Sequence, residues 1–426
     1  MIRFVIAFLA LTLSPVAAAQ DNVTIIHAGW LLAIPGEAPA EEQSIVILGE
    51  RIDRIESGFI EIDGAEYVDL SDHFVLPGLI DSHVHLLSEL NPERRLQNVT
   101  FSSADWAIDG VRNARATLMA GFTTVQDVGG ELEAIIALRD GQRDGDFAGP
   151  RMRVSGPSVT PTGGHGDING YNEDIMHAFS SRAACNGPAD CRRVVRELVR
   201  ARVDLIKITA TGGVLSQTAA GTEQQFFDDE LASIMEAARM MGRYVTAHAH
   251  GVTGINSAIE NGIHSIEHGT YLDEESIRLF RRNNVYLVPT LLAGATVAEI
   301  ATSADWMTPE VRQKSLEVGP NMIEMARRAH AGGVMIAFGT DSGVSRHGDN
   351  AREFALLVEA GLSPMDAIRS ATVTAAAHVQ MADDVGTIAP GRYADIIAVS
   401  GNPLDDITAL EDVDFVMQGG EVYSGQ

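Results

Sequence analysis

The chain has 426 residues, enough to bury a large core and to form more than one domain. Hydrophobic residues make up 45% of it and charged residues 21%, which is typical of a globular enzyme and excludes a disordered chain. Its formal net charge of -27 argues against a surface for the phosphates of DNA or RNA, so no nucleic-acid partner is expected.

Residues 1–19 have the three parts of a secretory signal peptide. Arg3 supplies a short positive region, an apolar run follows over residues 4–13, and residues 17–19 are alanines that fit a cleavage site. The run is too short to span a membrane, and no later stretch is long and apolar enough. The sequence therefore predicts cleavage near Ala19 and a mature protein, without a membrane span, that is periplasmic or secreted.

Residues 20–75 contain short β-like runs separated by glycine and charged turn residues, as in a meander. Residues 383–426 have the same character. Two all-β segments that flank one long middle region predict a small β-sandwich domain built from both chain ends.

The middle region, residues 76–382, alternates short apolar runs with helix-like segments. The runs that fit strands cover residues 74–80, 122–128, 151–156, 204–210, 244–250, 264–269, 285–290 and 334–343. The helix-like segments cover residues 105–121, 191–203, 228–242, 252–262, 273–284, 311–333 and 365–380. Eight strands that alternate with helices predict an α/β fold, a (β/α)₈ TIM barrel. An open doubly wound sheet is the alternative, but no glycine-rich phosphate motif follows the first strand.

The chain has two cysteines, Cys185 and Cys191, with a Gly-Pro turn between them. In a reducing compartment they would be two ordinary thiols. In an exported chain they favour a small loop-closing disulfide with a structural role.

Polar residues gather where the predicted strands end, which is where a barrel places its active site. Period two puts His83 and His85 on one face of the first strand. His248 and His268 end neighbouring strands, and neutral imidazoles suit zinc and related metals. Asp341 adds an oxygen ligand that could take a proton from water. Any one of these histidines is as often a core or capping residue, but together they indicate a metal site.

Lys207 lies between two isoleucines on the fourth predicted barrel strand, where an unpaired ammonium is very unfavourable. It could be an ordinary lysine that snorkels or pairs with Glu267 or Asp204. It could form a Schiff base, which would leave the histidines unexplained. It could also be carboxylated by CO₂ and then bridge two cations through oxygen.

This set of residues resembles the amidohydrolase superfamily. The resemblance is carried by "HVH" at 83–85, the strand-four lysine, single histidines that end strands five and six, and "GTDSG" at 339–343. The segment 386–407, "GTIAPGRYADIIAVSGNPLDDI", is similar to the closing β-segment of that superfamily, so the resemblance runs from about residue 22 to the chain end.

Three further motifs narrow the resemblance: "TGGHG" at 162–166, "HAHG" at 248–251 and "SIEHGT" at 265–270. They resemble the binuclear Xaa-Pro dipeptidase and carboxypeptidase-like branch, related to imidazolonepropionase. Within it the chain is similar to bacterial amidohydrolases that hydrolyse ochratoxin A to ochratoxin alpha and phenylalanine. The implied activity is hydrolysis of the amide bond of N-acyl amino acids or dipeptides with a free C-terminal carboxylate.

The resemblance also implies a centre of two divalent metal ions, with Zn²⁺ as the expected metal. It implies that His83, His85 and Asp341 bind the more buried ion. His248 and His268 would bind the second ion, and a carboxylated Lys207 would bridge both. Two histidines of "HAHG" compete for one position, and His248 is favoured because it stands where the strand ends and where the family's ligand falls. His250 would then line the substrate pocket.

The implied catalytic residues are Asp341, Lys207 and His165. Asp341 would take a proton from the attacking hydroxide and pass it to the leaving amine. His165 would stabilise the oxyanion or hold the substrate carboxylate. The candidate substrate contacts, besides His165 and His250, lie in the loops after strands one and eight: Ser88, Arg346 and His347, with Arg94 and Arg95 as further cations.

Two rival interpretations stay open. A mononuclear amidohydrolase, such as a deaminase or cyclic-amide hydrolase, would not need Lys207 as a bridge. A non-catalytic binding protein on the same fold would be expected to lose ligands, and here all the positions are filled. The partner expected is a small-molecule substrate, and relatives commonly form homo-oligomers.

Overall fold

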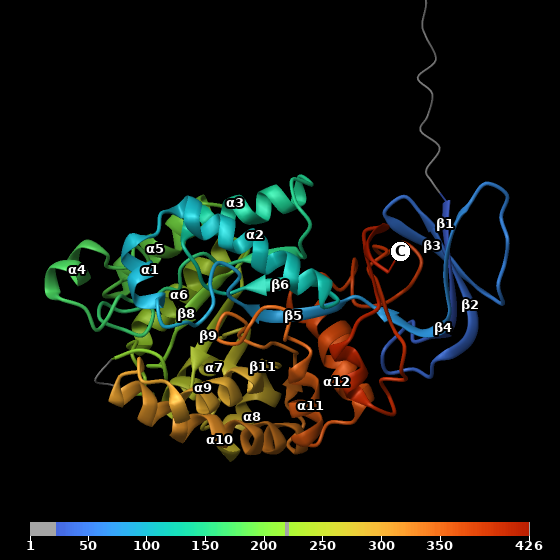
Figure 1. Cartoon of the computed structure of the whole chain (residues 1–426). Coiled ribbons are helices and arrows are strands. Elements are labelled where there is room, and N and C mark those ends of the chain that lie inside the picture. The colour runs from blue at the N-terminus through green and yellow to red at the C-terminus, as the bar shows by residue number, and fades with distance from the viewer. Residues whose placement is uncertain (1–22, 218–220, 426) are drawn as a thin grey trace, which may run out of the picture.

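The structure of the protein is a computed structural model that describes residues 23–217 and 221–425. The predicted signal peptide lies outside the described residues. Within them, no helix is long and apolar enough to cross a membrane. Figure 1 shows the N-terminal strands and the C-terminal segment together at one end of the molecule, and the long middle region at the other.

Both chain ends build one seven-stranded sheet. Its order is β15-β14-β13-β4-β1-β2-β3. The N-terminal strands are β1 (Val23–Leu31), β2 (Ala40–Leu48), β3 (Arg51–Ser57) and β4 (Glu66–Pro77). The C-terminal strands are β13 (Ile396–Val399), β14 (Phe415–Gln418) and β15 (Glu421–Ser424).

Strand β4 joins the two ends because both of its edges are paired. It is parallel to β1 and antiparallel to β13, with Val75 opposite Leu31 on one side and Ala398 on the other. Side chains from both chain ends share one core, including Ile26, Ile45 and Phe415. The joint β-domain is therefore found, with its strands hydrogen-bonded in one continuous order, and the two layers of a sandwich stay a prediction.

The middle region contains eight parallel strands in two sheets. The first sheet has the order β5-β6-β7 and the second β12-β11-β10-β9-β8. They comprise β5 (Leu79–Val84), β6 (Phe122–Asp127), β7 (Arg151–Val154), β8 (Ile206–Thr209), β9 (Val245–Ala249), β10 (Ser265–His268), β11 (Tyr286–Val288) and β12 (Met335–Ile336). Seven of the eight predicted strands are present as predicted; the first predicted run, residues 74–80, is instead divided between β4, which ends at Pro77, and β5, which begins at Leu79. Most of the eight parallel strands are buried along their whole length, as parallel strands covered by helices should be.

Backbone hydrogen bonds connect the two sheets on both sides. On one side Val159, beyond β7, accepts from Thr209 and donates to Lys207 of β8, with N–O distances of 3.0 and 2.8 Å. On the other side Ser82 of β5 donates to Phe338, just beyond β12, at 2.9 Å. The carboxyl ends of β5 and β8 to β10 thereby face a common region.

Helices surround the parallel strands (Figure 1). They are α1 (Arg94–Thr100), α2 (Ser103–Met119), α3 (Leu132–Arg143), α4 (Glu173–Ala178), α5 (Pro188–Arg200), α6 (Asp228–Met240), α7 (Val252–Glu260), α8 (Glu274–Asn283), α9 (Leu291–Ser303), α10 (Pro309–Ala331), α11 (Arg352–Glu359), α12 (Pro364–Arg369) and α13 (Ala375–His378). A π-helical turn, Ser370–Thr374, separates α12 from α13 inside one predicted helix, and a 3₁₀ turn covers Ile407–Glu411. The sequence missed α1, α3, α4, α9 and α11; α9 is apolar with a weak amphipathic pattern, which hides its period.

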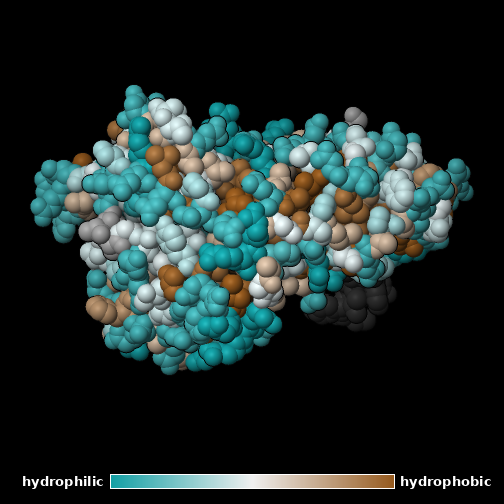
Figure 2. All heavy atoms as spheres, turned by 90° about the horizontal axis from the view of Figure 1, so that it is seen from below, coloured by the Kyte–Doolittle hydropathy of each residue, from teal (hydrophilic) through white to brown (hydrophobic). Residues whose placement is uncertain are grey.

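The predicted disulfide is present. Cys185 and Cys191 are bonded, with their Cα atoms 4.9 Å apart, and both are fully buried, Cys191 in the first turn of α5 and Cys185 just before that helix. The outer surface agrees with the composition, since the face in Figure 2 is largely hydrophilic with scattered apolar patches.

Candidate metal centre and active site

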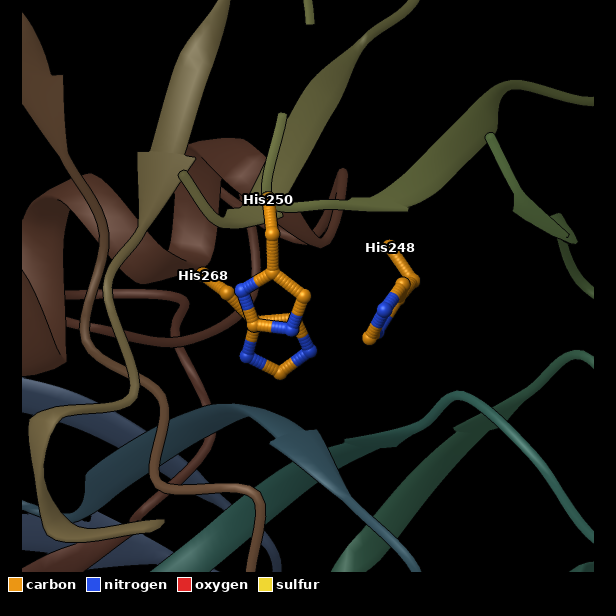
Figure 3. A group of neighbouring side chains, drawn as sticks. All are labelled: His248, His250 and His268. Carbon is orange, nitrogen blue, oxygen red and sulfur yellow. The ribbon is translucent and has the colours of Figure 1, made fainter. Parts of the chain in front are cut away.

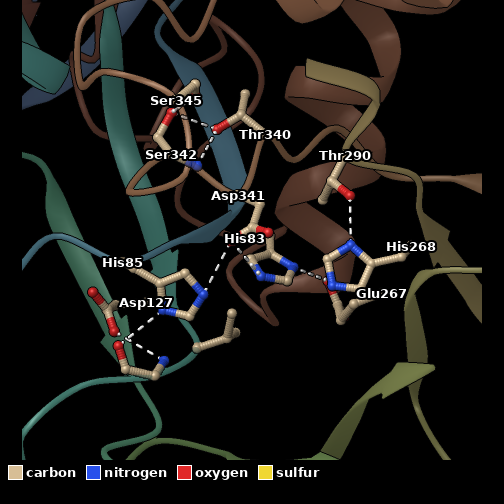
Figure 4. Close-up of polar contacts among 12 residues, drawn as sticks. His83, His85, Asp127, Glu267, His268, Thr290, Thr340, Asp341, Ser342 and Ser345 are labelled. Carbon is tan, nitrogen blue, oxygen red and sulfur yellow. Dashed lines mark hydrogen bonds and ion pairs between the residues drawn. The ribbon is translucent and has the colours of Figure 1, made fainter. Parts of the chain in front are cut away.

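Three of the predicted ligands form a first group at the carboxyl end of β5. His83 and His85 extend from that strand, and Asp341 follows β12. Asp341 Oδ1 lies 3.4 Å from His83 Nε2 and 3.1 Å from His85 Nε2 (Figure 4). Burial raises the pKa of Asp341, but the two imidazoles outweigh it and hold the pKa well below its usual range. The group therefore presents a carboxylate.

The Nδ1 atoms of His83 and His85 both donate hydrogen bonds to oxygen acceptors. His83 Nδ1 donates to Glu267 Oε2 at 2.7 Å, and His85 Nδ1 donates to the carbonyl of Gly129 at 2.9 Å. In the neutral rings each Nε2 therefore carries a lone pair that faces the Asp341 oxygen. Asp341 Oδ1 is buried without an aligned hydrogen bond. Three acceptors that face one another at this range fit a cation between them.

A second group lies at the ends of β9 and β10. His248, His250 and His268 each offer a ring nitrogen within 4.8 Å of the others. Figure 3 shows the rings of His250 and His268 stacked, with His248 beside them. Burial, followed by neighbouring imidazoles, lowers the pKa of His248 and His268 well below the usual value, and burial lowers that of His250 to about 3. Neutral imidazoles are the form that binds a metal.

The structure thus brings His250 into the same group as His248, where the sequence placed it in the pocket. Period two explains this, because both side chains project from the same face of β9. His250 Nδ1 contacts Thr270 Oγ1 at 2.8 Å, and His268 Nδ1 donates to Thr290 Oγ1 at 2.7 Å. Thr290 in turn donates to a carbonyl, so the Nε2 lone pair of His268 faces the centre.

Lys207 on β8 is 3% exposed, and its Nζ has no hydrogen-bond partner among the described residues. Burial lowers its pKa, against the opposing charges of Glu267, Asp341 and Asp127. It forms no ion pair with Glu267 or Asp204, the ordinary partners considered from the sequence. An amine buried without a hydrogen-bond partner is costly in a protein core unless it has a ligand role.

Backbone strain marks the same positions. Asp341, His268 and Thr290 have φ values of 58°, 72° and 51°, in the left-handed region that costs a non-glycine residue of order 1 kcal/mol or more. Two of the three are predicted ligands, and the third supports His268. Strain of this kind at strand ends is typical of residues held in place for function.

Asp81 supports the first group of ligands through hydrogen bonds. It is fully buried, and its carboxylate accepts from the backbone and side chain of Thr340, from the amide of Asn350 and from the backbone of His83. Burial raises its pKa to about 6. The backbone of His83 and the residue before Asp341 are therefore held by one carboxylate.

His165 lies beside the second group. Its ring stacks on that of His248, with centroids 4.2 Å apart. Burial, then the charges of Lys314 and Lys207, lowers the pKa of His165 to about 4. Its Nδ1 is buried without a hydrogen-bond partner, so a ring nitrogen is available at the candidate centre.

Of the remaining predicted substrate contacts, only His347 and Ser88 lie close to one of the candidate ligands, His85. His347 is buried, and its Nε2 lies 3.2 Å from the carbonyl of Ser88. Arg346 is exposed. Arg94 lies over the Trp106 ring, with its Cζ 5.0 Å from the ring centroid. None of these contacts joins the two histidine groups, and they stay predictions.

Two supporting residues carried little signal in the sequence. Glu267 was considered only as a partner of Lys207, yet it orients His83; its place one residue before His268 on the same strand was the available clue. Asp127 ends β6 and accepts from the backbone of Leu86 and Gly129, and burial raises its pKa to about 6. It holds the loop whose carbonyl binds His85.

Comparison with known proteins agrees with this geometry. The model of the Amidohydrolase family matches residues 74–424. The chain belongs to the amidohydrolase family.

Ochratoxinase from Aspergillus niger is 31% identical over 436 residues, covering 95% of this chain and 88% of that protein. A solved Xaa-Pro dipeptidase with bound methionine in its active site has a TM-score of 0.90 and 41% identity, covering 95% and 100% of the two chains. A prolidase complexed with N-methylphosphonate-L-proline has a TM-score of 0.85 and 31% identity, with the same coverage. The predicted resemblance is therefore confirmed, and this amidohydrolase is a metal-dependent hydrolase of amide bonds.

Proposed function

We propose that this amidohydrolase uses two divalent metal ions, with Zn²⁺ the expected metal, to cleave the amide bond of N-acyl amino acids and dipeptides that end in a free carboxylate. Ochratoxin A is a candidate substrate, with ochratoxin alpha and phenylalanine as the products. The likeness to a dipeptidase, a prolidase and an ochratoxinase supports this substrate class.

One observation carries the proposal: two groups of candidate metal ligands lie in the same pocket as the buried, unpartnered Nζ of Lys207, whose charge interacts with Asp341 of the first group and with His248 and His268 of the second. His83, His85 and Asp341 would hold one ion. The histidines of the second group would hold the other, with His248 and His268 as the ligands proposed from the family pattern. A carboxylated Lys207 would offer one oxygen to each ion. A mononuclear centre would leave that amine without a function.

The carboxylation is chemically consistent with the burial of Lys207. Burial favours the neutral amine, whose lone pair attacks the carbon of CO₂. An N–C bond forms, one proton leaves to water, and the carbamate takes the negative charge. Because Lys207 has no ion-pair partner, its buried ammonium is unfavourable. Carboxylation would replace this ammonium by an anionic carbamate that serves as a metal ligand.

When bound, two cations would acidify water and polarise the scissile carbonyl. The chain's own residues would then handle the proton and the oxyanion. Asp341, held as a carboxylate, would accept the proton of the attacking water and deliver it to the leaving amine nitrogen. His165, neutral above about pH 4, would donate a ring N–H to the carbonyl oxygen as its charge develops.

Three further proposals concern the whole protein. The two sheets of parallel strands, which are hydrogen-bonded on both sides, support a closed (β/α)₈ barrel. The pattern of residues 1–19 supports export, with cleavage near Ala19 and a periplasmic or secreted product. A homo-oligomer is expected by analogy with relatives.

A hydrolysis screen tests the activity. N-acyl amino acids, dipeptides and ochratoxin A are incubated with the purified protein, with and without a chelator, and the released amino acid is quantified. We expect release that the chelator abolishes and added Zn²⁺ restores. Binding of these compounds without turnover by the metal-loaded protein would instead favour the non-catalytic rival.

Metal counting and isotope labelling test the centre independently of activity. Elemental analysis should give two metal ions per chain, and ¹³C-bicarbonate should produce one carbamate signal. The Lys207→Ala variant should lose that signal and about half of the metal. Two metals and full activity in this variant would refute the bridging role and leave the mononuclear rival.

A further inference from the structure

The chain contains only two lysines among its 31 basic residues. One is Lys207 at the candidate centre, and the other is Lys314 on α10. Lys314 reaches the loop that follows β8, where its Nζ donates to the carbonyls of Gly213 at 2.6 Å and Ser216 at 2.5 Å. Both lysines of an arginine-rich chain therefore lie at or beside strand β8.

The contact with Gly213 places the Lys314 ammonium next to the centre. Gly213 packs so closely on His165 that an added Cβ would lie 2.3 Å from the ring. His165 in turn stacks on His248. After burial, the Lys314 charge is the largest contribution that lowers the pKa of His165, and it also lowers that of His250. The Lys314 charge is therefore close to the second group of histidines and to His165, which stacks on it.

The ammonium has capacity left for a ligand. A lysine Nζ has three N–H donors, and carbonyls of the chain accept from it at two positions. Lys314 makes no ion pair with the described residues, and it is half-buried. In a chain with a net charge of -27, a half-buried cation without a carboxylate partner is conspicuous. Its third donor points to an anion supplied from outside the chain.

We propose that Lys314 is the cation that binds the free carboxylate of the substrate, and so determines the preference for N-acyl amino acids over their amides. This inference rests on the proposed function. The carboxylate carbon of such a substrate is three bonds from the scissile carbonyl carbon, at most about 3.8 Å away. Its anchor must therefore lie beside the catalytic groups, as Lys314 does through Gly213 and His165.

The arginines considered from the sequence fit this role less well. Arg346 is exposed. Arg95 donates to the carbonyl of Gly170 and lies over Tyr171, and Arg94 lies over Trp106. These contacts hold the guanidinium groups against loops and rings, whereas Lys314 is in contact with the loop that packs on His165.

A pair of substrates isolates the carboxylate. We compare hydrolysis of N-acetyl-L-phenylalanine and N-acetyl-L-phenylalaninamide by the wild type and by Lys314→Gln, which keeps N–H donors for the two carbonyls but removes the charge. Loss of one charged hydrogen bond should lower kcat/KM for the acid about 10- to 100-fold, mainly through KM, and leave the amide within threefold. Lys314→Arg should keep part of the preference for the acid. Arg328→Gln, an exposed cation on the same helix, is the matched control and should behave as the wild type.

The outcomes separate this inference from the proposed function. An equal loss for acid and amide in Lys314→Gln would show that Lys314 only fixes the loop, and an unchanged preference would exclude any role in carboxylate binding. If the wild type hydrolyses neither compound, the proposed function fails. The inference is then decided by calorimetry with L-phenylalanine and L-phenylalaninamide: the wild type should bind the acid more tightly and Lys314→Gln should not, and equal binding by both proteins would overturn it.

Discussion

Glu267 provides the most direct test of how the core orients the first group of ligands. It is fully buried on β10, and burial raises its pKa. Lys207 and His83 outweigh that effect and lower the pKa to about 2, so the residue is a carboxylate. The carboxylate accepts from His83 Nδ1 at 2.7 Å, from Ser265 Oγ at 2.9 Å and from Thr246 Oγ1.

The Glu267→Leu substitution removes these acceptors at similar volume. Thr246 and Ser265 can still pair with each other, since their oxygens are 2.7 Å apart. The N–H of His83 keeps no acceptor, which costs about 1–3 kcal/mol for a buried donor. A free ring also loses the orientation that a metal ligand needs, and removal of such a support typically costs 10- to 100-fold in metal affinity.

We therefore expect Glu267→Leu to weaken Zn²⁺ binding about 10- to 100-fold, measured by competition with a chromophoric chelator. Glu267→Gln is the matched control: its carbonyl oxygen can accept from His83 while its NH₂ group donates to the two hydroxyls, so most of the affinity should remain. Circular dichroism confirms that both variants are folded. A folded Glu267→Leu protein with wild-type affinity would refute the argument that Glu267 positions His83.

Two further predictions concern stability. Replacing Cys185 and Cys191 by serine opens a short loop, so the free energy of unfolding in urea should fall by about 2 kcal/mol. A reductant should destabilise the wild type by the same amount and leave the stability of the variant unchanged. Burial, and then the charge of His264, lowers the pKa of His378 to about 3. As the pH falls from about 6.5 towards 3, His378 therefore takes up a proton in the unfolded state but not in the folded state, and the folded state loses stability. His378→Gln should therefore lose about 1 kcal/mol less per pH unit over this window, while His330→Gln should follow the wild type; equal acid sensitivity of all three proteins would contradict this.

The chain order of polar residues at strand ends was sufficient to predict most of the candidate centre. His83 and His85 share a strand face by the two-residue period, and Asp341 follows the last parallel strand. Parallel strands bring their carboxyl ends to one edge, so residues far apart in sequence meet there without further information. Short apolar runs that alternate with helix-like segments predicted seven of the eight parallel strands, and the similar β-runs at both chain ends predicted one joint domain.

The period could not separate His248 from His250, because both lie on the same face of β9 and only the packing of β10 places them together with His268.

Contacts made by loops and docked helices depend on the tertiary structure alone. The stacking of His165 on His248 follows from the path of a glycine-rich loop, which has no periodic pattern to read. Lys314 looks like an ordinary exposed residue on its helix, and only the docking of α10 brings its ammonium to Gly213. Glu267 is likewise identified as the support of His83 only by the folding of β5 and β10 around one core. Local sequence determined which residues could bind a metal, whereas long-range packing decided which side chains hold them in place.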